Sequence, residues 1–259
     1  MRIFWGAAAL ILLVAGCAPA PVPGRGDGVV LLVDWRGGLV PSYEVIDPPD
    51  FVLYGNGQAI VREDRDTDVL RLVEYRLTPE RVQTLFEEAE DAGLFDDEDY
   101  SFDEQVPDGG TLMIVLRTEE REHVVEIPVP GLADSGARDD ATEFAKSLTP
   151  SNWAASDFSR RSSPYRPGRV AVTYQVREPT ATPSKYDTVP RRWPLAEPEP
   201  IHDGCVVLTG ETATRAQEIG ESRSRSTLWQ HDGVEFHAWI RPLLPDEADC
   251  DEIEQRYFE

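Results

Sequence analysis

A proline-rich stretch in the second half of the chain limits the possible folds more than any other feature. Residues 177–200 contain six prolines in 24 positions. Because proline lacks a backbone N–H and has a fixed φ, this stretch is incompatible with a buried helix or a central strand. It therefore predicts a connector between two folded parts. We expect a first lobe over 29–150, an aromatic, basic and proline-rich connector over 151–200 that includes a strand over 169–177, and a second lobe over 201–259.

The first lobe carries the pattern of a mainly antiparallel sheet. An apolar run at 29–35 predicts a strand, and Asn56-Gly57 between two apolar runs predicts a hairpin with a two-residue turn. Such a turn pairs Leu53 with Ile60. Apolar residues then occur on both faces, so we expect this hairpin to be central and covered on both sides.

A second hairpin is expected, with strands over 112–118 and 123–129. With a loop at 119–122, Leu116 lies opposite Val125, which gives the hairpin one apolar face.

The segment after residue 77 has the boundary residues of an amphipathic helix. Thr78 is the predicted N-cap, Pro79 takes the first helical position and Gly93 ends the helix. Apolar residues follow at helical spacing and predict the buried stripe: Val82, Leu85, Phe86 and Ala89. The same spacing recurs over 141–148, and a weaker helix is expected over 211–222.

The second lobe contains a hairpin around Asp232-Gly233, a favoured two-residue turn. It pairs Leu228 with His237 and places Trp239 on the same outer face, so we interpret these three residues as a candidate binding patch. The predicted inner face consists of Trp229, Val234, Phe236, Ala238 and Ile240. The fold class expected for the chain is α+β, with mainly antiparallel sheets and packed helices in two small lobes.

Charge excludes one class of partner. The 259 residues contain 25 Lys+Arg and 48 Asp+Glu, a formal net charge of −23. Binding of a nucleic acid depends on basic side chains that neutralise phosphates, so we expect no nucleic-acid partner.

The N-terminus has the features of an export signal. Residues 3–16 are uncharged, a run too short for a stable membrane span, which needs about 20 apolar residues. The run ends in Val14-Ala15-Gly16-Cys17, which resembles the lipobox of bacterial lipoproteins, although those motifs most often have leucine at the position of Val14.

This resemblance implies that residues 1–16 are a signal peptide and that Cys17 carries a lipid. Residues 17–28, with three prolines, are then a flexible tether. The expected location is the extracytoplasmic face of the cell membrane, with the lipid as the membrane contact. The alternative is an uncleaved signal or a short anchor with a chance cysteine.

With Cys17 assigned to lipid, Cys205 and Cys250 remain as an even pair in an oxidising compartment, and we expect them to form a disulfide. Two free thiols or a metal pair are the alternatives. No histidine or other cysteine lies at ligand spacing beside either of them, so we expect no metal site and no cofactor.

Charge is also segregated along the chain. Ten carboxylates and no basic residue lie between Glu87 and Glu104, whereas eight basic and two acidic residues lie between Arg160 and Arg192. The basic segment is either a docking site for an anionic wall polymer or envelope protein, or it pairs with the acidic surface of the chain itself. We favour the second interpretation because it needs no partner.

Common catalytic motifs are missing from the sequence: G-x-S-x-G, H-E-x-x-H, a Walker loop and G-x-G-x-x-G after a strand. Of the four histidines, His123 and His231 are expected at turns, and His202 precedes the disulfide cysteine. His237, beside Trp239, is the one candidate for an activated nucleophile or water. No catalytic residue is assigned.

Over 28–150 the body resembles secreted bacterial lipoproteins of unknown function, on its Gly37-Gly38 strand end, its Asn-Gly hairpin and its Thr-Pro-Glu helix. That resemblance implies a class of protein and assigns no functional residues. Three hypotheses follow: a non-catalytic binding module at the cell envelope, which we favour, an envelope hydrolase centred on His237, and a structural envelope protein.

Overall fold

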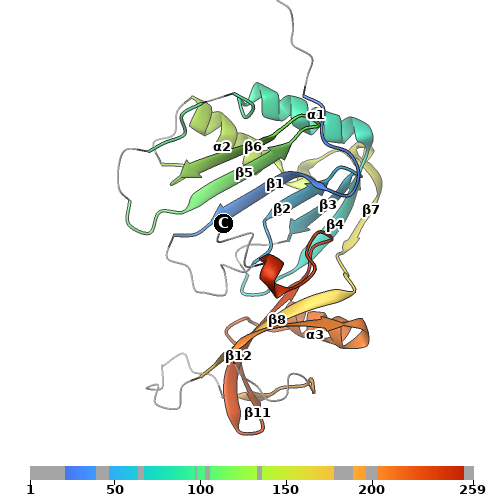
Figure 1. Cartoon of the computed structure of the whole chain (residues 1–259), viewed down its shortest axis with the longest axis vertical. Coiled ribbons are helices and arrows are strands. Elements are labelled where there is room, and N and C mark those ends of the chain that lie inside the picture. The colour runs from blue at the N-terminus through green and yellow to red at the C-terminus, as the bar shows by residue number, and fades with distance from the viewer. Residues whose placement is uncertain are drawn as a thin grey trace, which may run out of the picture.

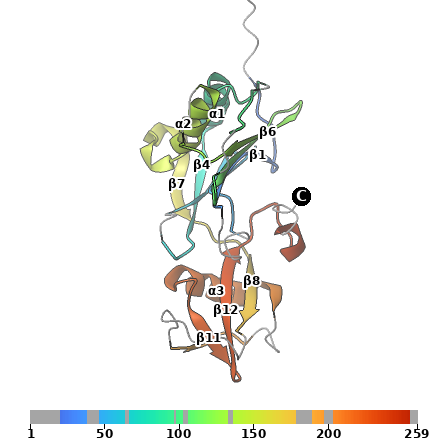
Figure 2. The ribbon, with the colours of Figure 1, turned by 90° about the vertical axis from the view of Figure 1, so that its left-hand side faces the viewer.

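In the part of the chain that it describes, the computed structural model contains two separate β-sheets with helices packed on them (Figures 1 and 2). The described residues are 21–38, 47–63, 67–96, 98–102, 106–132, 136–177, 189–196 and 203–253. The fold is therefore mixed α+β and dominated by sheet, as the sequence predicted.

All but one of the strand pairs in the two sheets are antiparallel; the exception is β9 with β11. The first sheet has the order β6 (Glu122–Pro128), β5 (Thr111–Arg117), β1 (Val29–Arg36), β2 (Phe51–Tyr54), β3 (Gln58–Arg62), β4 (Leu72–Leu77) and β7 (Phe158–Pro164). The second sheet has the order β10 (Gly204–Thr209), β8 (Arg169–Val176), β12 (Val234–Pro242), β11 (Leu228–His231) and β9 (Arg191–Arg192).

Helices α1 (Pro79–Asp91) and α2 (Ala137–Ser147) lie on one side of the first sheet (Figure 2). The predicted boundaries of α1 are confirmed. The Thr78 hydroxyl accepts a hydrogen bond from the Arg81 backbone N–H at 3.2 Å, and Gly93 has φ +74° just beyond the helix end. The predicted stripe is buried in a core that α1, α2 and the sheet share.

The β2–β3 turn differs by one residue from the prediction. The Gly57 N–H donates to the Tyr54 carbonyl at 2.8 Å, and Gly57 has φ +83°, so the loop contains three residues and ends in a left-handed glycine. Leu53 therefore pairs with Ala59 and not with Ile60. Leu53 and Ala59 face the helices, whereas Ile60 packs on the opposite face. The predicted central position, with both faces covered, is confirmed.

In the β5–β6 hairpin the predicted pairing is wrong by two residues. Leu116 pairs with His123 and Ile114 with Val125. A shift of two positions leaves each side chain on its face, because strand side chains alternate with period two. The predicted apolar face is therefore still the one that packs in the core.

The largest difference from the prediction concerns the connector expected over 151–200. Residues 158–164 form β7, the edge strand next to β4, and residues 169–176 form β8, which lies inside the second sheet. The polypeptide thus crosses from one sheet to the other between Pro164 and Arg169. The strand predicted over 169–177 is thus confirmed, but it belongs to the second sheet and not to a connector. Val170, Val172 and Tyr174 of β8 are buried with α3 (Gly210–Ser222), which holds the strand there.

The two sheets are joined by residues that follow β12. Leu244 and Tyr165 are buried against the face of the first sheet that is opposite to α1 and α2. Tyr54 in β2 donates its hydroxyl to Asp246 at 2.6 Å, and Tyr165 donates its hydroxyl to the Leu243 carbonyl at 2.8 Å. The segment after β12 is therefore a bridge between the sheets, on the side away from the helices (Figure 2).

A buried ion pair fixes the start of this bridge. Arg241 in β12 makes two hydrogen bonds with the carboxylate of Glu247, at 2.7 and 2.8 Å, and the side chains are 2% and 0% exposed. The same carboxylate accepts the Leu244 backbone N–H at 2.7 Å. The chain from 241 to 247 is thereby closed into a tight turn that places Leu244 on the first sheet.

We expect Glu247→Leu to lower the free energy of unfolding by about 3–5 kcal/mol, because it leaves the Arg241 charge buried without its partner. The double variant Arg241→Met/Glu247→Leu should lose much less, since both charges are removed. Urea denaturation of the oxidised protein measures both values. Equal losses in the single and double variants would contradict this account.

The Tyr165 hydroxyl predicts a dependence of stability on high pH. Burial, aided by the nearby carboxylates of Glu247, Glu74 and Asp246, raises the pKa of Tyr165 well above its ordinary value. The folded state therefore favours the protonated phenol. Its contribution is present below pH about 10, the unfolded pKa of tyrosine, and is lost as pH rises above that value. Wild type should lose about 1 kcal/mol more stability than Tyr165→Phe between pH 9 and 11 in urea titrations; parallel curves would refute this.

Candidate functional site: an arginine-lined hollow beside the second sheet

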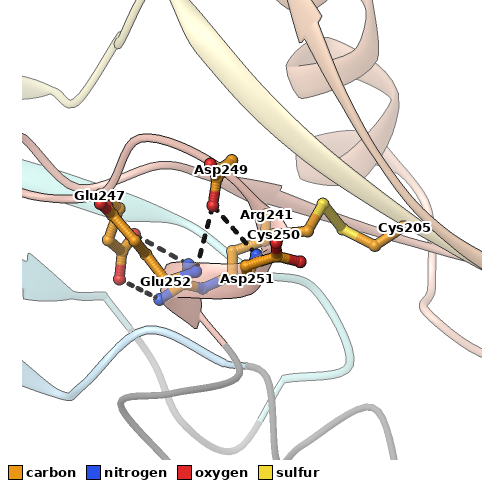
Figure 3. The surroundings of a disulfide bond; sticks show 7 residues. All are labelled: Cys205, Arg241, Glu247, Asp249, Cys250, Asp251 and Glu252. Atoms are coloured by element: carbon orange, nitrogen blue, oxygen red, sulfur yellow. Dashed lines mark hydrogen bonds and ion pairs between the residues drawn. A yellow bond between two sulfur atoms is a disulfide. The ribbon is translucent and has the colours of Figure 1, made fainter.

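The predicted disulfide is present between Cys205 and Cys250, with a Cα–Cα distance of 6.1 Å (Figure 3). It links β10 to the segment after β12, close to the Arg241–Glu247 pair. The bond packs against Ala171 and Leu243 on the face of the second sheet opposite to α3. Its position makes it a structural link for the bridge, and closing a loop of this length stabilises by roughly 4 kcal/mol in the chain-entropy model.

The predicted binding patch has the expected register but is not exposed. Leu228 pairs with His237, and Asp232 and Gly233 have the positive φ values of the predicted turn. However, Leu228 and Trp239 are only 3% and 8% exposed. Alternation determines which side chains share a face of a strand, but it does not show whether that face is covered. The interpretation of this trio as an exposed patch is therefore wrong.

His237 is half-buried, and its ring stacks on Trp239 with 6.2 Å between ring centroids. Within the described residues, no hydrogen bond or ion pair joins His237 to a serine or a carboxylate. His123 packs edge-on against Phe95 at 4.8 Å, and His231 lies 3.7 Å from the Asp232 carboxylate. His202 lies outside the described residues. The described part of the chain also holds no cluster of three or more metal-binding side chains.

The residues of the lipobox-like motif, Val14 to Cys17, lie outside the described residues. Of the helices that the structure describes, none has the length and apolar character needed to cross a membrane.

The end of the predicted tether is packed and not free. Pro23 forms a β-bridge with Thr118, and the Glu119 N–H donates to the Val22 carbonyl at 3.3 Å. Gln83 of α1 donates its side-chain amide to the Pro21 carbonyl at 3.3 Å. These contacts hold residues 21–24 against the β5–β6 turn and α1. The prediction of a flexible tether over all of 17–28 is wrong for this part.

Some arginines of the basic segment form ion pairs within the chain, and others have no ion pair among the described residues. Arg160 pairs with Glu74 at 2.6 Å, Arg166 pairs with Glu221, and Arg177 contacts Glu235 at 3.3 Å. Arg169 donates to the backbone carbonyls of the bridge segment. The favoured interpretation, pairing with the chain's own surface, is confirmed for these residues.

Arg191 and Arg192 behave differently. They form β9, the edge strand beside β11, and both are exposed. Neither forms an ion pair with a carboxylate of the described residues. They line one side of a hollow of about 640 Å³.

The opposite side of this hollow comes from α3 and the residue that follows it. Arg215, Glu218, Ile219 and Ser222 lie at positions i, i+3, i+4 and i+7, which is one face of a helix. Arg223 follows directly after the helix end. Pro194 and Trp229 complete the lining, and Trp229 is held by edge-to-face contact with Trp193 at 5.1 Å.

The lining thus contains four arginines and one carboxylate, Glu218, in a chain of net charge −23. Arg215 and Arg223, like the arginines of β9, have no ion pair within the described part of the chain. A lining of this composition attracts anions, because the guanidinium group donates several hydrogen bonds in a fixed plane.

Only half of this arginine set was visible in the sequence. Arg191 and Arg192 belong to the basic segment, whereas Arg215 and Arg223 lie more than 20 residues away in a region with mixed charge. The helical spacing of Arg215 and Ser222 indicates that they share one face of a helix. The pairing of β9 with β11 brings Arg191 and Arg192 to the same hollow. This pairing could not be predicted, because a strand of two residues is too short to show periodicity in the sequence.

Comparison of the chain with protein-family models, with curated proteins and with solved structures finds no match. The candidate site therefore rests on geometry and charge alone.

We expect Trp239→Ala to act on stability. It removes a buried aromatic side chain and should lower the free energy of unfolding by about 3–5 kcal/mol. Gln230→Ala, at an exposed position of the neighbouring strand β11, is the matched control and should change it by less than about 0.5 kcal/mol. Thermal and urea unfolding measure both. A Trp239→Ala protein as stable as wild type would show that this side chain is not part of the packing.

Proposed function

We propose that this protein is a lipid-anchored, non-catalytic binding module on the extracytoplasmic face of the cell membrane. In this proposal, residues 1–16 are removed as a signal peptide and Cys17 carries the lipid. We further propose that each sheet, with its helices, is a small lobe that folds as a unit. The first lobe is then the support near the membrane, and the second lobe presents the binding site.

The observation that carries this proposal is the docking of residues 21–24 on the first lobe. These residues lie beside α1, at the opposite end of the long axis from β11 (Figure 1). Three residues separate Cys17 from Pro21, and a fully extended chain spans about 3.5 Å per residue. A lipid on Cys17 therefore holds the α1 end of the molecule within roughly 15 Å of the membrane surface.

This orientation places the arginine-lined hollow far from the membrane. The hollow lies between α3 and β9, which belong to the end of the molecule remote from α1. A site for a partner in the cell envelope needs this position, because a ligand that is not part of the anchoring membrane then reaches it freely. Binding is favoured over hydrolysis because the arginines of the hollow have no ion pair among the described residues, while no described contact activates His237.

Cys17→Ala tests the anchor. With the thiol removed, no thioether to a lipid forms, and the variant should move from the membrane fraction to the soluble fraction of lysed cells. Cys250→Ala is the matched control, because it removes a thiol of the disulfide and should leave the protein in the membrane fraction. Membrane retention of Cys17→Ala, or an unmodified thiol at Cys17 in the mass spectrum of the wild-type protein, would overturn the proposal.

A further inference from the structure

We infer that the arginine-lined hollow binds a phosphate-bearing polymer of the cell envelope, in which a single flexible chain carries repeated phosphate groups. The inference deepens the proposed function and rests on it for the source of the ligand. The chemistry of the site itself, by contrast, follows from the lining and is independent of the lipid.

The first observation is that one hollow is lined by four arginines without an ion pair among the described residues. Arg160, Arg166 and Arg177 each have a carboxylate partner, although they lie in the same basic segment as Arg191 and Arg192. In a chain with almost twice as many carboxylates as basic residues, the lack of ion pairs between these arginines and the described carboxylates is not explained by a shortage of partners. Four of them around one hollow repel one another, and an anion between them relieves that repulsion.

The arginines of the hollow lie on two parts of its lining. Arg191 and Arg192 come from β9, and Arg215 and Arg223 come from the end of the hollow formed by α3. A phosphate group near an arginine of the lining accepts hydrogen bonds from a guanidinium group in the plane that suits its oxygens. Arg215 and Arg223 are eight residues apart, about 12 Å along a helix, so the four arginines are spread over the lining. Arginines spread in this way match two or more phosphates along one chain better than they match a single anion.

The size and the apolar surface of the hollow indicate a ligand of many atoms. The volume of about 640 Å³ lies in the range of sites for ligands of many atoms, far beyond the needs of one phosphate ion. Pro194, Ile219 and Trp229 add apolar surface to the lining. That surface suits the carbon atoms of sugar or polyol units that lie between phosphates.

The rest of the molecule restricts which polyanions gain access. With a net charge of −23, the chain as a whole repels a stiff, wide polyanion such as duplex DNA. A single flexible chain can place a few phosphates in the hollow while the remainder points away from the acidic surface. Headgroups of the anchoring membrane are disfavoured as ligands, because the hollow lies at the end remote from residues 21–24.

The experiment uses the purified mature chain with Cys17→Ala, so that the lipid is not needed for binding. Isothermal titration calorimetry at low salt measures binding of three probes: short-chain inorganic polyphosphate, inorganic phosphate and polyglutamate of matched charge. We expect binding of polyphosphate, at least tenfold weaker binding of inorganic phosphate and of polyglutamate, and loss of affinity as salt is raised.

Variants then locate the site. Arg215→Gln and Arg192→Gln should each weaken polyphosphate binding by roughly tenfold, because each removes a charge-assisted hydrogen bond. Glu218→Gln removes the one carboxylate of the lining and should strengthen binding severalfold. Arg161→Gln is the matched control: Arg161 is exposed on β7, also lacks an ion pair among the described residues, and lies on the other sheet. It should leave affinity unchanged.

Three results would overturn the inference. They are no polyphosphate binding by the folded protein at low salt, equal losses for Arg161→Gln and Arg215→Gln, and tighter binding to polyglutamate or to phosphatidylglycerol vesicles than to polyphosphate. Because these measurements use a chain without lipid, they fail or succeed independently of the fractionation of Cys17→Ala. The gain expected for Glu218→Gln keeps the test informative even where an arginine variant folds poorly.

Discussion

The arrangement of the whole molecule depends on the buried pair between Arg241 and Glu247. Two charges removed from water are stable only when their geometry and their remaining hydrogen bonds are satisfied, and here the Glu247 carboxylate accepts from both the guanidinium and the Leu244 N–H. The pair closes the turn after β12, and that turn delivers Leu244 to the first sheet. Cys250, three residues beyond Glu247, then ties the same segment back to β10 (Figure 3). A local electrostatic contact therefore sets how the two sheets meet.

Polar contacts dominate the remainder of that junction. Asp47 binds Arg62 of the first sheet at 3.0 Å and Arg225, just before β11, at 2.7 Å. Arg166 binds Glu221 of α3, and Gln217 of the same helix donates its side-chain amide to the Tyr165 carbonyl at 2.6 Å. The junction thus uses arginines for internal pairing, whereas the four arginines around the hollow have no ion pair among the described residues.

The elements that the sequence predicted well are those specified by local chemistry. Helix α1 begins at an N-cap and a proline and ends at a glycine, so its limits depend only on residues within one turn of each end. The β11–β12 register followed from Asp232-Gly233 for the same reason. The β2–β3 register did not, because Asn56-Gly57 is compatible with both a two-residue and a three-residue loop, and the Gly57 hydrogen bond decides between them.

Features that depend on tertiary burial could not be predicted from turn residues, helix caps or alternation. The outer face with Trp239 has the alternation of an exposed strand face, yet the side chain is buried. A strand over 169–177 was predicted within a long connector, but its burial against α3 makes it part of the second sheet. The candidate site also depends on tertiary structure. Its arginines come from separate segments of the chain, and the pairing of β9 with β11 brings these segments together.

The packed N-terminal segment links these observations to function. A long free tether lets a module take any orientation, whereas the docking of residues 21–24 beside α1 leaves three residues between the body and Cys17. In the proposed lipid-anchored form, the attachment runs from Cys17 through the first sheet and the bridge after β12 to the second sheet. The Arg241–Glu247 pair and the disulfide lie on this bridge, so they stabilise the position of the second sheet relative to residues 21–24. The stability of the bridge then also determines how far from the anchor the proposed binding site lies.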